Sequence, residues 1–232
     1  MQALLRLDNV TKSFSGIKVV DELSFEVQEH DIIGVIGPNG AGKTTLVNLI
    51  SGMLQLDSGF IYFKGERIDS LRPFQIVRKG VARSFQIPKP FKNMTVTENL
   101  TVPIITVHKG LDSGRIQEIL RILDLQKVSD LPAGSISVGQ QKLLEIGRMF
   151  ALDPELMMLD EPTAGVHPDL RRMVVQILKG IDKTILMVSH DLNFVKLLCN
   201  RAIVLNAGKK VVEGDLSCLK DPLVAEAYLG RK

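Results

Sequence analysis

Residues 37–44 (GPNGAGKT) constrain the fold of this chain more than any other segment. They fit the phosphate-binding pattern G-x-x-x-x-G-K-[ST], in which glycines let backbone N–H groups converge on phosphate oxygens. The apolar run 32–36 precedes the loop, and a helical pattern over residues 44–50 follows it. A buried strand, a tight loop and a helix open a parallel α/β unit, so we predict an α/β fold of the P-loop type.

Each residue type in this loop has a chemical reason for its place. The helix that follows presents its positive end to the phosphates. Lys43 adds a full positive charge near the β- and γ-phosphates, and the Thr44 hydroxyl is placed to bind Mg²⁺. The predicted nucleotide-binding residues of this segment are Gly37, Asn39, Gly40, Ala41, Gly42, Lys43, Thr44 and Thr45.

A second apolar run, residues 156–159, ends on two carboxylates. Asp160 is suited to hold Mg²⁺ through water, and Glu161 follows where a carboxylate can orient or deprotonate the attacking water. Acidic residues also end strands for solubility alone, but beside a phosphate loop the pair indicates the catalytic half of the site. A helical pattern at 169–178 and an apolar run at 184–188 follow, which predicts a parallel βαβ crossover.

The remaining patterns predict one domain with two lobes. Residues 4–10, 18–27 and 60–64 alternate like strands, and residues 202–213 read as a hairpin that turns at 206–208. Residues 115–125 carry Ile116, Ile119, Leu120 and Leu123 on one helical face, with Asp112 or Ser113 available as a cap, and a second helix runs from about 140 to 150. We therefore expect a single domain, 1–232, with a helical insertion at about 92–150 between core segments 1–91 and 151–232.

Composition excludes several classes of protein. The net charge is only +3 and no basic cluster accompanies it, so we expect no nucleic-acid partner. Apolar runs stop after about five residues, far below the roughly twenty that a bilayer span needs. The N-terminus lacks the apolar stretch of a signal peptide, and Cys199 and Cys218 fit neither a disulfide framework nor a metal site. We expect a soluble chain in a reducing compartment, with any membrane role supplied by a partner.

The segment 137–141 (SVGQQ) decides among P-loop enzymes. Serine followed by glycine at a helix start makes a cap with free N–H groups, which is a second anion site. One chain has no use for two γ-phosphate cradles, whereas two chains packed head to tail would use both; a simple helix cap is the alternative. The segment resembles the signature motif of ABC ATPases, LSGGQ, from which Ile136 and Val138 depart.

This resemblance extends over nearly the whole chain, with the motifs in the family's order. It implies an ABC cassette with a RecA-like core, an N-terminal antiparallel β subdomain and an inserted α-helical subdomain, which hydrolyses ATP with Mg²⁺. The resemblance implies these roles: Glu161, His190 and Gln86 in catalysis; Thr44, Gln86 and Asp160 at the metal; Ser137, Gly139 and Gln140 on the nucleotide of a partner cassette.

Two positions leave alternatives open. Phe14 lies where the family places an aromatic ring that stacks on adenine, but it would serve equally as a core residue of the N-terminal sheet. His167 stands where many members carry aspartate in the segment that crosses the dimer interface. The histidine leaves open how that segment communicates with the opposite site.

Finer features are similar to the ATP-binding subunits of branched-chain amino acid importers. They are residues 80–86 (GVARSFQ), residues 91–100 (FKNMTVTENL), the doubled glutamine leading into 144–148 (LEIGR), and residues 227–230 (AYLG). The helical insertion is shorter than is usual there, and Val138 and Gly147 replace the usual residues.

That similarity implies a set of partners. These are a second ATPase subunit, either a copy or a paralogue, transmembrane permease subunits, and a separate solute-binding protein. The chain would lie on the cytoplasmic face of the cell membrane and energise import of branched-chain or other hydrophobic amino acids. An exporter or lipid-transport ATPase shares every nucleotide motif. A nucleic-acid-associated ABC ATPase usually adds tandem cassettes or basic insertions, and a P-loop kinase or GTPase would leave the signature without a purpose.

Overall fold

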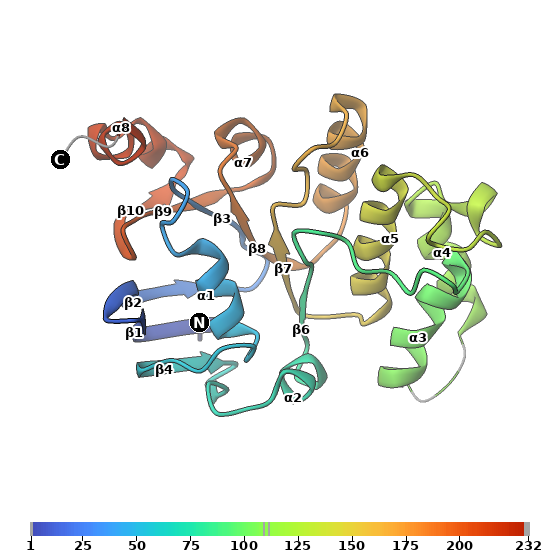
Figure 1. Ribbon diagram of the computed structural model, residues 1–232, viewed down its shortest axis with the longest axis horizontal. Coiled ribbons are helices and arrows are strands. Elements are labelled where there is room, and N and C mark those ends of the chain that lie inside the picture. The colour runs from blue at the N-terminus through green and yellow to red at the C-terminus, as the bar shows by residue number, and fades with distance from the viewer. Residues whose placement is uncertain (1, 109, 111, 230–232) are drawn as a thin grey trace.

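The computed structural model describes residues 2–108, 110 and 112–229, in which the strands form two sheets (Figure 1). The antiparallel sheet has the order β2-β1-β4-β5, with β1 Leu5–Phe14, β2 Ile17–Val27, β4 Ser58–Phe63 and β5 Glu66–Arg67. The mixed sheet has the order β10-β9-β3-β8-β7-β6, with β3 Ile32–Ile36, β6 Val81–Arg83, β7 Leu156–Asp160, β8 Thr184–Ser189, β9 Arg201–Asn206 and β10 Lys209–Asp215. The predicted α/β class is confirmed.

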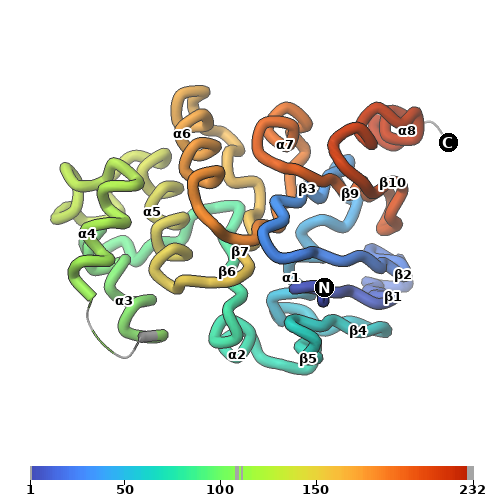
Figure 2. The backbone as a smooth tube through the Cα atoms, turned by 180° about the vertical axis from the view of Figure 1, so that it is seen from behind, coloured from blue at the N-terminus to red at the C-terminus, as the bar shows by residue number. Residues whose placement is uncertain are grey.

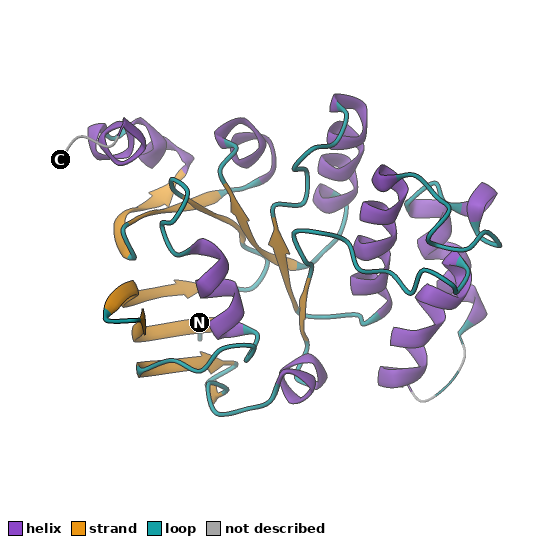
Figure 3. Ribbon diagram, viewed as in Figure 1, coloured by secondary structure: helices purple, strands orange, loops and turns teal. Residues whose placement is uncertain are grey.

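The helices divide between the faces of the mixed sheet and one end of the molecule. They are α1 Lys43–Ile50, α2 Pro73–Arg78, α3 Val96–His108, α4 Ser113–Ile122, α5 Val138–Ala151, α6 Pro168–Lys179, α7 Leu192–Leu198 and α8 Pro222–Leu229, with short 3-10 turns η1 Gln126–Val128 and η2 Leu216–Lys220. Seen from behind, α6, α7 and α8 line one side of the mixed sheet (Figure 2). Helices α3, α4 and α5 gather at the end opposite α8 (Figure 3). Within the described ranges, none of the helices has the length and apolar character of a bilayer span.

Strand β7 shows why the central strands are apolar throughout. Leu156 and Met158 belong to the core shared with α1 and the antiparallel sheet, whereas Met157 and Leu159 face the core under α5 and α6. Because successive side chains point to opposite faces, a strand covered on both sides must be apolar at every position. Strand β7 pairs in parallel with β8, as the predicted crossover requires.

Most predicted elements are confirmed, and the differences have local causes. The terminal hairpin forms from β9 and β10, and Asp112 caps α4 by accepting a hydrogen bond from the Arg115 N–H at 3.0 Å. Strand β1 continues to Phe14, beyond the predicted end at residue 10. The prediction stopped early because the register shifts near Asn9, whose φ is 48°. Such a bulge interrupts the alternation of side chains from which a strand is predicted.

Strands β5 and β6 and helices α2, α3, α7 and α8 were not predicted. The pattern of α3 is obscured by Pro103 inside the helix and by β-branched neighbours. The others are eight residues long or shorter, so their periodicity is weak.

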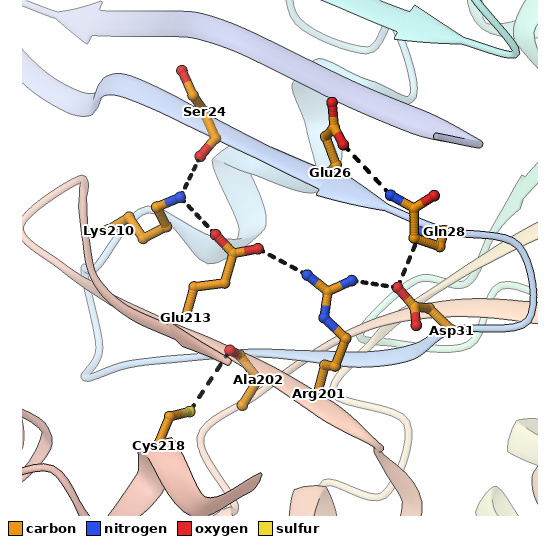
Figure 4. A network of polar contacts seen from close by, with 9 residues as sticks. All are labelled: Ser24, Glu26, Gln28, Asp31, Arg201, Ala202, Lys210, Glu213 and Cys218. Atoms are coloured by element: carbon orange, nitrogen blue, oxygen red, sulfur yellow. Dashed lines mark hydrogen bonds and ion pairs between the residues drawn. The ribbon is translucent and has the colours of Figure 1, made fainter. Parts of the chain in front are cut away.

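A polar network joins the antiparallel sheet to the edge of the mixed sheet (Figure 4). Arg201 donates to Asp31 Oδ2 at 2.5 Å and to Glu213 Oε1 at 3.0 Å. Lys210 donates to Glu213 Oε2 at 2.6 Å and to the Ser24 carbonyl at 2.7 Å. Asp31 comes directly before β3, so the network fixes the start of the strand that carries the phosphate loop.

Gly34 brings α7 close to the middle of β3. A Cβ atom at this position would lie 2.7 Å from Val195 Cγ1 and 3.1 Å from Cys199 Sγ, both on or next to α7. Contacts this short require one of the two elements to move. Glycine at residue 34 therefore sets the distance between the strand that precedes the phosphate loop and the helix that follows His190.

We predict that Gly34→Ala lowers the free energy of unfolding by about 1–3 kcal/mol, because the added methyl group overpacks this contact. Urea unfolding followed by circular dichroism measures the change as a lower midpoint at constant slope. Gly114→Ala is the control, since the new Cβ would meet only Asp112 Oδ1 at 3.5 Å. A Gly34→Ala midpoint equal to that of wild type would contradict the tight fit.

Candidate nucleotide-binding site

The phosphate loop passes so close to neighbouring backbone that two of its positions admit only glycine. A Cβ at Gly37 would lie 2.2 Å from the Leu205 carbonyl oxygen, and one at Gly42 would lie 2.4 Å from the Val19 carbonyl oxygen. Gly42 also has a φ of 98°, in the left-handed region. Helix α1 begins directly after it, and no side chain in the described part of the chain caps its N-terminus. Its first N–H groups are therefore available to an anion.

Lys43 is held beneath the loop by the loop itself. Its ammonium donates to the carbonyl oxygens of Gly37 at 2.7 Å and Pro38 at 2.9 Å. Burial lowers the pKa of Lys43, while the negative charges of Glu161 and Asp160 raise it. A fixed positive charge in this position suits a phosphate placed over the loop.

Asp160 ends β7 as a buried carboxylate with an unused oxygen. Its backbone N–H donates to Ser84 Oγ at 3.0 Å, and its Oδ2 lies 3.9 Å from Arg83 Nη2. Burial raises the pKa of this carboxyl, and the Arg83 charge opposes that shift. Asp160 Oδ1 is buried and has no hydrogen-bond partner within the described chain. An orphaned carboxylate oxygen is costly unless a cation or water completes it.

Glu161 and His190 meet across adjacent strand ends. Glu161 Oε1 accepts from the His190 backbone N–H at 3.1 Å and lies 2.7 Å from His190 Nδ1. Strands β7 and β8 pair with Asp160 opposite Val188, which brings the residues after each strand together. Glu161 has a φ of 50°, an uncommon conformation for a residue other than glycine, and its side chain is only 12% exposed. The histidine ring is 59% exposed, so its far edge remains open to a ligand.

One cleft unites most of the predicted nucleotide residues. It is lined by Val19, Asn39, Gly40, Ala41, Gly42, Lys43, Thr44, Thr45, Gln86 and Glu161. The phosphate loop, the glutamine of the loop after β6 and the carboxylate after β7 thus share one space. Val19 was not predicted, because its place depends on the approach of β2 to the loop rather than on any motif. Phe14 is 43% exposed, so the alternative of a core residue is wrong.

The signature residues lie outside this cleft, at the start of α5. Ser137 Oγ accepts from the Gln140 N–H at 3.2 Å, and Gln140 Oε1 accepts from the Ser137 N–H at 3.0 Å. This reciprocal arrangement is a capping box. A Cβ at Gly139 would lie 2.8 Å from Leu170 Cδ2, so α5 meets α6 closely at this end. Ser137, Gly139 and Gln140 are not among the residues that line the cleft, so the cap and the phosphate loop of one chain do not form a single site.

His167 forms the N-terminal cap of α6. Its Nδ1 accepts a hydrogen bond from the Asp169 N–H at 3.4 Å, and the imidazole is 76% exposed. Farther along α6, Arg171 pairs with Asp191 at 2.6 Å, which links the helix to the residue after His190. The Arg171–Asp191 ion pair thus connects α6, which follows the Glu161 segment, to the residues around His190.

Tyr228 of α8 was not predicted as part of the site. Its hydroxyl is buried without a geometrically aligned hydrogen-bond partner in the described residues. Burial raises the pKa of this phenol, the Gly37 N–H lowers it, and the charge of Glu161 raises it. A residue near the end of the described chain therefore lies beside the phosphate loop. Helix α8 packs on β9 and β10, and this long-range packing has no local signal in the sequence.

Comparison with known proteins identifies the family. Residues 20–164 match the family model described as ABC transporter. A probable branched-chain amino acid transport ATP-binding protein LivG of Methanocaldococcus jannaschii is 35% identical, over 98% of this chain and 97% of that protein. The high-affinity branched-chain amino acid transport ATP-binding protein BraF of Pseudomonas aeruginosa is 32% identical, over 98% of each chain.

Solved structures agree with the sequence relatives. A nucleotide-free ATP-binding cassette from an ABC transporter superposes with a TM-score of 0.88 at 33% identity, covering 99% of this chain and all of that one. A cassette in its ADP conformation gives 0.87 at 34% identity over the full length of both chains. A dimeric cassette in a post-hydrolysis state with ADP and Pi gives 0.83 at 26% identity, covering 91% of this chain and 98% of that one. The chain belongs to the ABC transporter family and is one of its ATP-hydrolysing cassettes.

Proposed function

We propose that this cassette drives import of branched-chain or other hydrophobic amino acids. It would work as a head-to-tail dimer on the cytoplasmic face of the membrane, bound to transmembrane permease subunits. A separate solute-binding protein would deliver the amino acid to the permease. The division of the site carries the dimer proposal: the phosphate loop, Gln86 and Glu161 line one cleft, whereas the Ser137 cap lies elsewhere. The printed names of the sequence relatives support the substrate class.

Binding of ATP would rest on backbone N–H groups and one buried cation. The open N-terminus of α1 and the Lys43 ammonium would hold the β- and γ-phosphates. Phe14 presents an exposed ring, with the Lys12 ammonium 5.6 Å from its centroid, and would stack on adenine.

The residues at the end of β7 fit a magnesium ion. Among residues 2–108, 110 and 112–229, no three His, Cys, Asp or Glu side chains form a metal-ligand group. Mg²⁺ in nucleotide sites takes one or two protein ligands plus phosphate oxygens and water. Asp160 Oδ1, which has no partner among the described residues, would meet that need, and Thr44 and Gln86 would complete the set. When bound, the ion supplies charge neutralisation on the phosphate oxygens.

Glu161 and His190 would act on the attacking water and the γ-phosphate. The contact between Glu161 Oε1 and the His190 N–H and Nδ1 fixes the carboxylate beside the phosphate loop. Glu161 would then orient or deprotonate the water, and the exposed edge of His190 would contact the γ-phosphate. Positioning and charge carry most of phosphoryl transfer, so a rigid carboxylate is what the reaction needs.

Ser137, Gly139 and Gln140 of each chain would meet the nucleotide of the other. ATP would then hold the two cassettes together, and hydrolysis would release them.

We propose that α3, α4 and α5 form the helical lobe at about 92–150, inserted between core segments 1–91 and 151–232. The loop that carries Gln86 also exposes Phe85, Ile87 and Phe91, and exposed apolar side chains on one loop suit a permease contact.

Lys43→Ala should raise the dissociation constant for Mg²⁺-ATP by at least about 30-fold, because a charge-assisted contact worth roughly 2 kcal/mol is lost. Isothermal titration calorimetry measures the change. Lys127→Ala, on exposed η1, is the control and should bind as wild type does. Unchanged affinity in Lys43→Ala would remove the loop from phosphate binding.

Glu161→Gln should retain ATP affinity, hydrolyse ATP about 10²–10⁴-fold more slowly, and accumulate as a dimer. Size-exclusion chromatography with light scattering, with and without Mg²⁺-ATP, follows the dimer. An ATP-dependent shift to twice the mass supports a homodimer. A monomer under both conditions argues against a homodimer, and repeating the run with the paralogous subunit then tests the heterodimer.

The substrate class can be tested with the permease and solute-binding protein that co-purify with the tagged chain. In liposomes, a solute-binding protein loaded with leucine should stimulate ATP hydrolysis, and one offered glutamate should not. Lys43→Ala complexes provide the background rate. Stimulation by a lipid, with no response to any amino acid, would favour the exporter or lipid-transport alternative.

A further inference from the structure

Helix α5 holds the loop that contains Gln86 through a partly buried carboxylate. Glu145 Oε1 accepts a hydrogen bond from the Phe85 backbone N–H at 2.6 Å. Burial raises the pKa of Glu145, while that N–H and the charges of Arg148, Lys142 and Arg83 lower it. Even partial burial of a carboxylate is costly unless its charge is compensated, and a short hydrogen bond from a backbone N–H supplies such compensation.

The same face of α5 holds the far end of this loop. Arg148, three residues after Glu145, donates to the Lys89 carbonyl oxygen at 2.9 Å. Its guanidinium also lies 4.9 Å from the centroid of the Phe91 ring. Residues spaced by three lie on one helical face, so a single surface of α5 grips residues 85–91 at both ends.

The residues just before the loop are held by the core instead. Ser84 N–H donates to the Met158 carbonyl at 2.8 Å, and Ser84 Oγ accepts from Asp160 N–H at 3.0 Å. Arg83 donates to Asn48 Oδ1 at 2.7 Å and to Ser51 Oγ at 2.9 Å, both at α1. The chain is therefore hydrogen-bonded to the core up to Ser84 and to α5 from Phe85 onward. Gln86, which lines the nucleotide cleft, is the next residue.

One turn earlier on α5, Lys142 reaches the segment that follows the catalytic carboxylate. Its ammonium donates to the Ala164 carbonyl oxygen. Burial lowers the pKa of Lys142, and the charges of Glu145 and Glu161 raise it. Helix α5 thus contacts the segments after β6 and after β7, and it begins at the Ser137 cap.

We propose that Glu145 is a positioning residue that fixes the Phe85 backbone, and through it holds Gln86 in the nucleotide cleft and joins that cleft to the helix beginning at Ser137. The proposal rests on the proposed roles of Gln86 and Ser137 in ATP hydrolysis. A shift of Gln86 at the γ-phosphate of one site would then displace α5 through the Phe85–Glu145 hydrogen bond. The first turn of α5 would in turn contact the nucleotide bound by the partner. A Glu145 that only stabilised the packing of α5 would not act through Gln86.

Side-chain geometry separates contact from charge. Glu145→Asp keeps the negative charge but is one methylene too short to reach the Phe85 N–H. Glu145→Gln loses the charge but keeps an acceptor oxygen at the same reach. We expect Asp and Ala at this position to release the loop and Gln to retain it. Glu118→Gln on the exposed face of α4 is the matched control.

Amide hydrogen exchange of the full-length chain, without nucleotide, tests the contact directly. Exchange in a peptide covering residues 84–91 should become at least about tenfold faster in Glu145→Asp and Glu145→Ala, since a protecting hydrogen bond is lost. It should stay within about twofold of wild type in Glu145→Gln and Glu118→Gln. Fast exchange in Glu145→Gln with protection in Glu145→Asp would show that charge, not the contact, matters and would overturn the proposal.

Turnover with Mg²⁺-ATP tests the connection to Gln86. Glu145→Ala should lower kcat about tenfold and leave the dissociation constant for ATP within about twofold, as expected for a residue acting on positioning. In a Gln86→Ala background the same change should cost less than about twofold, because residues that act as a unit are not additive. Losses that multiply would overturn the proposal. A wild-type chain without turnover would count against the proposed function instead, and the exchange result would still stand.

Discussion

The parallel pairing of β3, β8 and β7 is the constraint on which the rest of this site depends. Strand β3 runs into the phosphate loop, β7 into Asp160 and Glu161, and β8 into His190. Parallel strands end at the same edge of a sheet, so three segments far apart in the chain meet there without any direct sequence relationship. The register then decides which atoms touch, and it brings Glu161 within 2.7 Å of His190 Nδ1.

Charge balance at this edge follows from burial. Lys43 and Arg83 bring positive charge close to Asp160, and each of these three groups is partly withdrawn from water. Burial disfavours each of these charges, and the attraction between Asp160 and the two cations opposes that effect. Among the described residues, Asp160 Oδ1 nevertheless has no hydrogen-bond partner, and this incomplete compensation is the observation on which the proposed magnesium site rests.

Local chemistry was predictable from the sequence, whereas contacts between distant segments were not. The phosphate loop, the apolar strands and the Ser137 cap each show within about ten residues, because glycine spacing, alternation and capping are local properties. The hydrogen bond from the Phe85 N–H to Glu145 spans 60 positions, and Tyr228 reaches Gly37 from the other end of the chain. Such contacts depend on how helices pack on the sheet, for which one sequence carries no periodic signal.

The departures from the ABC family pattern concern helix packing and capping rather than the nucleotide cleft. A Cβ at Gly147 would lie 2.6 Å from Leu123 Cδ1 and 3.0 Å from Leu100 Cδ2, so glycine lets these leucines of the α3 and α4 segments pack directly on α5, and alanine would require them to shift. Val138 is 65% exposed in the first turn of α5 and leaves the capping box of Ser137 intact.

His167 retains the capping role that an aspartate would fill at the start of α6, because its Nδ1 accepts from the Asp169 N–H. In this chain the departures at Val138, Gly147 and His167 lie at the capping and packing contacts of α5 and α6. The phosphate loop allows less change, because the backbone of β2 and β9 leaves no room for a side chain at Gly42 and Gly37.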